Sequence, residues 1–129
     1  MSYYFATTLD AGFDAAVERT TAALKEAGFG IITEIDVGQT FRNKLGIDYR
    51  DYRILGACNP RMAHEALSIE DKVGTMLPCN VIVQDLGGGK VEVAAIDPVA
   101  SMAAIQNDAL GGPAQQVRTM LKGVIDRLA

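Results

Sequence analysis

Hydrophobic and polar residues alternate in several short stretches of the chain, which is the pattern of half-buried β-strands. These stretches contain many β-branched residues and are bounded by Gly, Pro, Asn or Asp. They predict five strands, at residues 3–8, 30–36, 52–58, 80–86 and 91–97. The sequence GGGK at 87–90 predicts a tight hairpin between the last two strands. A phosphate loop is disfavoured there because the GxxxxGK[ST] motif is absent and no helix follows.

Between these strands, apolar residues recur at three- and four-residue spacing, which predicts amphipathic helices. One helix is expected at 13–27, with Gly28 as its C-terminal cap. A short helix is expected at 37–45, because Asp36 and Gln39 have the spacing of a capping box. Further helices are expected at 60–69 and from Gly112-Pro113 to the C-terminus.

The predicted order is β-α-β-(short α)-β-α-β-β-α, a single α+β domain over residues 1–129. We expect a five-stranded, largely antiparallel sheet with helices on one face. Several strands are apolar on both faces; Ile31 and Ile35 are expected on one side of their strand and Ile32 on the other. One layer of helices cannot cover both faces, so the second face is predicted to meet another copy of the chain in a homodimer.

Composition narrows the class of protein. The 129 residues are 49% hydrophobic and 22% charged, with a net charge of −4. The acidic balance argues against sequence-independent binding to nucleic acid or to an anionic membrane. No apolar run approaches the roughly 18 residues that cross a bilayer, and the first residues lack the basic and apolar regions of a signal peptide. We therefore expect a cytoplasmic protein whose two cysteines are free thiols.

Four segments resemble a known family: GFGIITEID at 28–36, KLGIDYRDYRILGACNP at 44–60, MLPCNVIV at 76–83 and Asp97-Pro98. Together they look like the family called domain of unknown function 302, in its two-cysteine type. The resemblance implies a small α+β fold that tends to dimerise, and it implies no established activity. Some relatives lack one or both cysteines, so thiol chemistry would at most belong to a subgroup.

The stretch GACNPRMAHEAL at 56–67 is the most suggestive corner of the sequence. Asn59 is a favoured N-cap and Pro60 a favoured first helical residue. On the helix that follows, five apolar residues form the buried side: Met62, Ala63, Ala66, Leu67 and Ile69. His64 falls on the opposite side, which argues against a Cys58–His64 nucleophilic pair.

Cys58 lies just before this helix, where the helix dipole and free N–H groups favour a thiolate. Cys79 lies at the entrance of the next strand. If residues 70–77 bring this entrance close to Cys58, the thiols could act as a redox pair or as soft ligands for a metal or haem. A right-handed crossover would instead place them at opposite edges of the sheet. The simplest interpretation is that each cysteine is a small buried hydrophobe.

Positive charge gathers ahead of the same corner, at Arg42, Lys44, Arg50, Arg53 and Arg61. A helix N-terminus beside arginines is a natural anion site, although local charge pairing on a solvated face explains the pattern as well. The candidate ligand-binding residues are therefore Cys58, Asn59, Pro60 and Cys79, with Arg53 and Arg61 as anion contacts.

No catalytic constellation stands out, no metal ligands are assigned and no cofactor is identified. Glu34 and Asp36 share a strand face, but no histidine or metal-ligand cluster lies beside them in the sequence. The leading interpretation is a small-molecule-binding or accessory module. The alternative is a thiol-based redox protein, or one that handles sulfur, haem or metal, using Cys58 and Cys79.

Overall fold

A single antiparallel sheet organises the chain, in a computed structural model that describes residues 2–129. Neighbouring strands run in the order β1-β5-β4-β3-β2, and every pair is antiparallel. The strands are β1 (Tyr4–Asp10), β2 (Gly30–Asp36), β3 (Tyr52–Cys58), β4 (Cys79–Gly87) and β5 (Lys90–Ile96). The predicted α+β fold with an antiparallel five-stranded sheet is confirmed.

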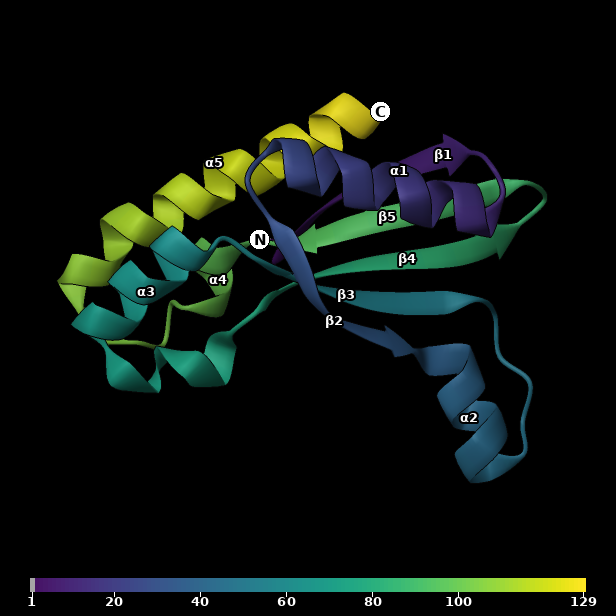
Figure 1. Cartoon of the computed structure of the whole chain (residues 1–129), viewed down its shortest axis with the longest axis horizontal. Helices are drawn as coiled ribbons and strands as arrows, with labels where there is room; N and C mark the ends of the chain where they lie inside the picture. The colour runs from purple at the N-terminus through teal and green to yellow at the C-terminus, as the bar shows by residue number, and fades with distance from the viewer. Residues whose placement is uncertain (1) are drawn as a thin grey trace.

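The helices occupy three places around this sheet (Figure 1). The long helices α1 (Phe13–Glu26) and α5 (Gly111–Leu128) cover one face. Beyond the end where β3 stops and β4 starts lie α3 (Pro60–Ile69), α4 (Pro98–Ser101) and the 3₁₀ helices η1 (Asp71–Met76) and η2 (Asp108–Leu110). At the opposite end, α2 (Val37–Leu45) stands away from the rest of the molecule. The sequence predicted α2 and α3 with these bounds, but not α4 or the 3₁₀ helices.

The main core lies between the sheet and the helices α1 and α5. Its strand side is built from alternate residues of β3, β4 and β5, such as Leu55, Val81 and Val93, all almost fully buried. The helices contribute Leu24 from α1 and Leu121 from α5. Burying side chains of this size stabilises the fold by about 1.5–3 kcal/mol each. The packing of α1 and α5 against this face of the sheet is therefore stable.

Strand β2 departs from the simple alternation expected of it. A β-bulge shifts its register against β3 between Ile31 and Thr33. Ile31 lies opposite Ala57 and packs against the core, whereas Ile35 lies opposite Ile54 on the other face and is exposed. The prediction that Ile31 and Ile35 share a face is therefore wrong, because the extra residue of a bulge reverses the side-chain alternation after it.

Two local predictions from the sequence are confirmed in their main features, although the side chain of Gln39 donates to Asn43 instead of completing the capping box. Asp36 caps α2, since its side chain accepts a hydrogen bond from the backbone N–H of Gln39 at 2.9 Å, and Gly46 ends the helix with a φ of 65°. The hairpin between β4 and β5 turns through Gly87, Gly88 and Gly89, each with positive φ. Glycine adopts this backbone conformation without steric cost.

The helices of residues 2–129 are all too short or too polar to span a lipid bilayer.

Gly56 is fixed by the packing of its neighbours across the sheet. A Cβ atom added there would collide with the hydroxyl of Thr33 on β2 and lie 2.7 Å from Cγ of Pro78, which precedes β4. Thr33 belongs to β2 and Pro78 directly precedes β4, the two strands that flank β3, so neither can move freely. Only glycine lets the three segments approach this closely at the end of the sheet.

We expect Gly56→Ala to lower the free energy of unfolding by about 1–3 kcal/mol, the usual cost of overpacking a rigid site. Gly30→Ala on β2 is the matched control, because a Cβ there meets nothing within 4 Å. Urea unfolding followed by circular dichroism measures both. Equal stability of the two variants would show that the packing around Gly56 is not restrictive.

Candidate functional site

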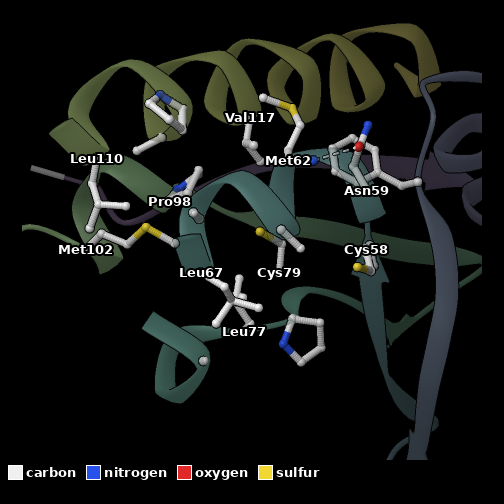
Figure 2. Close-up of a pocket in the computed structure, with 18 of the residues that line it drawn as sticks. Cys58, Asn59, Met62, Leu67, Leu77, Cys79, Pro98, Met102, Leu110 and Val117 are labelled. Atoms are coloured by element: carbon white, nitrogen blue, oxygen red, sulfur yellow. Dashed lines mark hydrogen bonds between the residues drawn. The ribbon is translucent and has the colours of Figure 1, made fainter. Parts of the chain in front are cut away.

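A cavity of about 350 Å³ lies at the end of the sheet where β3 ends and β4 begins (Figure 2). It is enclosed by the sheet end, α3, η1, α4 and the first turns of α5. Its lining is almost entirely apolar, with thioether, aliphatic and small side chains dominating. Characteristic lining residues are Met62, Leu67, Met102, Leu110 and Val117.

The cavity exists because β3 and β4 are antiparallel neighbours. Ala57 lies opposite Cys79, so the chain must leave β3 and return to its side over residues 59–78. This excursion forms α3 and η1, which pack against each other, and α3 also packs against α5 and η2. A second small apolar cluster of Ala66, Val73 and Leu110 holds these helices together.

Helix α3 begins as the sequence predicts. The side chain of Asn59 accepts a hydrogen bond from the backbone N–H of Met62 at 3.2 Å, and Pro60 occupies the first helical position. Met62, Ala63 and Ala66 face the cavity, while His64 is exposed and is not part of the lining. Leu67 was expected to be buried; it lines the cavity mouth and is 42% exposed.

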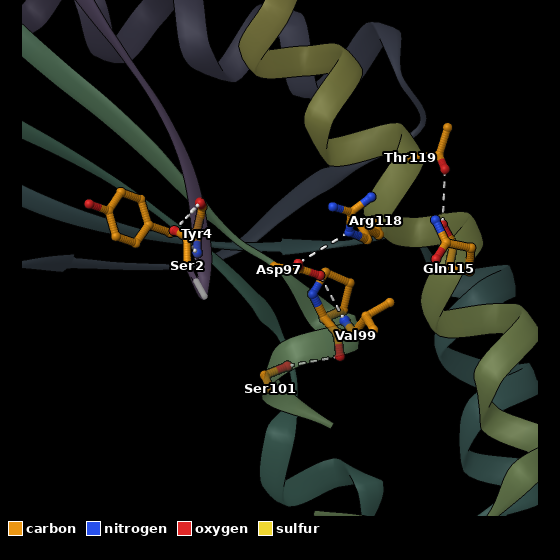
Figure 3. A network of polar contacts seen from close by, with 9 residues as sticks. Ser2, Tyr4, Asp97, Val99, Ser101, Gln115, Arg118 and Thr119 are labelled. Carbon is orange, nitrogen blue, oxygen red and sulfur yellow. Dashed lines mark hydrogen bonds and ion pairs between the residues drawn. The ribbon is translucent and has the colours of Figure 1, made fainter. Parts of the chain in front are cut away.

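Asp97 anchors the opposite wall of the cavity (Figure 3). It is only 8% exposed, and its carboxylate accepts hydrogen bonds from the backbone N–H of Val99 at 3.0 Å and from Nε of Arg118 at 3.1 Å. The Arg118 guanidinium also lies over the ring of Phe5, 5.0 Å from its centroid. These contacts tie α4 to α5 and to β1, and Asp97 follows the last residue of β5 and caps α4.

The two cysteines are neighbours at the junction of β3 and β4. Cys58 is the last residue of β3 and Cys79 is the first of β4, one position away from direct pairing. The arrangement with thiols at opposite edges of the sheet is therefore excluded. Successive strand residues point to opposite faces, yet both cysteines line the cavity, which extends around the sheet end (Figure 2).

The thiols differ in their surroundings. Both are free; Cys58 is half-buried, whereas Cys79 is 8% exposed. Burial, with a smaller contribution from neighbouring Cys58, raises the pKa of the Cys79 thiol to about 11. Desolvation disfavours the charged thiolate, so Cys79 is a neutral thiol near pH 7 and a poor nucleophile.

The basic residues do not gather at the cavity. Arg53 lies at the start of β3, about 17 Å of strand from Cys58 at ~3.4 Å per residue. It binds Glu34 at 2.9 Å and Asp36 at 3.6 Å, and its guanidinium lies over the ring of Phe13. Arg61 is exposed on the first turn of α3 and does not line the cavity.

Of the six candidate binding residues, the structure thus brings Cys58, Asn59 and Cys79 together at the cavity, with Pro60 just outside its lining. It adds residues from distant parts of the chain, including Phe29, Met102 and Val117. Met102 belongs to a stretch of mostly small residues, SMAAI at 101–105, that begins at the end of α4. Nothing local distinguishes Phe29 or Val117, because both also fit the main core.

Within residues 2–129, no three His, Cys, Asp or Glu side chains lie close enough together to hold a metal ion.

Comparisons with known proteins agree with this architecture. The family model described as "Domain of unknown function DUF302" matches residues 5–128. A crystal structure of an uncharacterized conserved protein DUF302 from Bacillus stearothermophilus is similar, with 25% sequence identity, a TM-score of 0.91 and all of both chains covered. No curated protein matches the chain significantly.

We expect alkylation of Cys79 to be slow at neutral pH and to accelerate about tenfold per pH unit up to its pKa of about 11, because only the thiolate reacts. The measurement is mass spectrometry of a Cys58→Ser variant treated with iodoacetamide, with folding monitored by circular dichroism. The same variant unfolded in urea is the control, since it should titrate near the ordinary thiol pKa of about 8.5. A native midpoint at or below that value would contradict the buried, neutral thiol.

Proposed function

The chain belongs to the family described as domain of unknown function DUF302, and from its cavity we propose that it is a small-molecule-binding module for a neutral, largely apolar ligand. The single observation that carries the proposal is the apolar cavity of about 350 Å³ beside Cys58 and Cys79. Ligand pockets commonly have volumes of about 300–1,000 Å³ and mostly apolar linings. An apolar cavity of about 150 Å³ already accommodates benzene.

The size of the cavity, about 350 Å³, fits a compound of one to three rings or a short branched chain. Few polar groups are available to orient it. Asn59 and the Cys58 thiol lie on the sheet side, while the helices contribute mainly aliphatic and thioether surface. We therefore propose that shape and apolar contact supply most of the affinity and that Asn59 selects the orientation of one polar group on the ligand.

An anionic ligand fits this cavity less well. Among residues 2–129, no Lys, Arg, Asp or Glu side chain lines the cavity, and Arg53 is paired with Glu34 and Asp36 at the far end of β3. A charge taken into such surroundings without a partner is strongly disfavoured. An anion would have to bind outside the cavity, near Arg61 and the exposed start of α3.

The same cavity supports a second proposal, in which the thiols handle a soft metal ion, sulfur species or haem. The observation in its favour is that two thiols and the thioethers of Met62 and Met102 line one cavity. Such soft sulfur ligands suit copper(I) and similar ions. The raised pKa of Cys79 weighs against resting thiolate chemistry, although a bound metal ion would displace the proton. Colour, metal content and sulfur analysis of purified protein distinguish this proposal from binding of an organic ligand.

We expect the neutral fluorescent probe N-phenylnaphthylamine to bind in the cavity. The substitution Ala63→Met should lower the affinity for the probe at least tenfold, because the larger side chain fills the space beside α3. A tenfold loss corresponds to about 1.4 kcal/mol. Ala15→Met is the matched control, because Ala15 is an exposed helical residue of α1. Probe fluorescence and thermal unfolding with and without probe provide the measurements.

Inorganic phosphate serves as the anionic comparison in the same thermal assay. Stabilisation by phosphate but not by the neutral probe would reverse the proposed ligand class. Equal probe binding by the wild type, Ala63→Met and Ala15→Met would place the probe elsewhere and remove the support for the cavity.

A further inference from the structure

The face of the sheet turned away from α1 and α5, called here the open face, carries a continuous apolar row. Strand pairing aligns Ala6 of β1, Ala94 of β5, Ile82 of β4, Ile54 of β3 and Ile35 of β2. The row crosses all five strands, and its outermost member Ile35 is 48% exposed. The bulge in β2 produces this row, because it turns Ile35 away from the core.

A hollow of about 330 Å³ lies on the open face beside this row. Tyr3, Tyr4 and Tyr52 contribute to its walls, and Glu92 is the one carboxylate among its lining residues. The Gln84 side-chain amide donates to Glu92 at 2.8 Å and accepts from Arg50 at 3.2 Å. The hollow thus has a mixed lining of tyrosine rings, aliphatic side chains and the polar side chains of Asn80, Gln84 and Glu92, with Glu92 as its carboxylate.

Helix α2 projects beside this face and is almost uncovered (Figure 1). Among its nine residues only Gly38 is buried, where it packs against the backbone of Arg50. Leu45 is 65% exposed, and Ile47 and Tyr49 after the helix are also exposed. Isolated helices shorter than about 12–15 residues are marginal in water, so α2 has the composition and exposure of a helix that packs against a further surface.

Aromatic contacts make α2 and the open face one continuous surface. The rings of Phe41 and Tyr49 meet edge to face with centroids 5.1 Å apart, and Tyr49 lies 6.3 Å from Tyr52 on the open face. More than half of the large apolar side chains exposed in residues 2–129 belong to this surface: Tyr3, Tyr4, Ile35, Leu45, Ile47 and Tyr49.

Charge on this surface is self-complementary. The last turn of α2 carries Arg42, which pairs with Asp48 at 3.5 Å, and Lys44, whereas the hollow carries Glu92. A two-fold pairing presents each element to its counterpart on the other copy, because an isologous interface uses the same patch twice. The basic helix of one copy and the acidic hollow of the other can then meet twice in one dimer.

The surface area available on the open face and α2 supports the same pairing. Five strands about 4.8 Å apart and seven residues long at ~3.4 Å per residue give the open face a footprint on the order of 500–600 Å². Stable interfaces bury about 800 Å² on each partner. The sheet alone falls short of that area, and the exposed surface of α2 is placed to supply the difference.

We propose that the open face and α2 together form the interface with a second copy of this chain, with α2 of each protomer lying over the hollow of the other. Pairing through the free edges of β1 or β2 would leave the apolar row and α2 in water. Helix α2 lies at the opposite end of the sheet from the cavity, whereas the hollow reaches toward the cavity end, where its Asn80 directly follows Cys79. The described residues that line the hollow are all different from those that line the cavity, so variants of the interface and of the ligand site can be made separately.

We expect the wild-type protein to be a dimer by light scattering at micromolar concentration and Leu45→Glu to weaken dimerisation at least tenfold. Met76→Glu is the matched control, because Met76 is an exposed apolar residue of η1 at the other end of the sheet and belongs to neither the cavity nor the hollow. Leu45→Glu should leave the circular dichroism spectrum and the binding of N-phenylnaphthylamine unchanged. Failure of the dimer and failure of ligand binding are therefore distinguishable.

A charge reversal tests the pairing of α2 with the hollow. Glu92→Lys should weaken the dimer at least tenfold, and the double variant Glu92→Lys with Lys44→Glu should recover most of the loss. A monomeric wild-type protein would overturn the proposal. So would a dimer that Leu45→Glu and Glu92→Lys leave intact, because that dimer would use an edge strand or another surface.

Discussion

The antiparallel pairing of β3 with β4 is the constraint on which the rest of the structure depends. With Ala57 opposite Cys79, the chain that leaves β3 must turn back at the same end of the sheet. Residues 59–78 are too many for a tight turn, so they form α3 and η1 and fold over that end. The cavity is the space left between this excursion, the last strand residues and the two helices that follow β5.

Side chains and backbone are tightly packed at this end of the sheet. Gly56 has no room for a Cβ because Thr33 and Pro78 approach from both neighbouring strands. Asn59 then starts α3, and Asp97 ties α4 to α5 through Arg118. Each of these contacts joins only two or three residues. Together they connect the end of the sheet, α3, α4 and α5 around the cavity.

The sheet separates two kinds of surface. At one end, the cavity encloses apolar side chains and two thiols; on the open face, an apolar row and a hollow lie beside a projecting helix. The thiol environment follows from the same separation. Cys79 is buried at the cavity and holds its proton, whereas the charged residues Arg53, Glu34 and Asp36 neutralise one another at the far end of the strands.

The sequence by itself determined the elements whose signals are local. Asn59-Pro60 and Asp36 identified the starts of α3 and α2, the Gly-rich turn identified the hairpin, and the periodicity identified the strands, because capping bonds and amphipathic spacing involve residues only a few positions apart. Cys58, Asn59 and Cys79 could be named as one site for the same reason: they flank one segment.

Only the tertiary structure decided which side chains meet. It placed Arg53 far from Asn59, and the bulge in β2 turned the side chain of Ile35 to the open face. It also brought Phe29, Met102 and Val117 to the same cavity. These outcomes depend on strand register and on packing between distant segments. A shift of one residue moves a strand side chain to the other face, and no local pattern in the sequence records that shift.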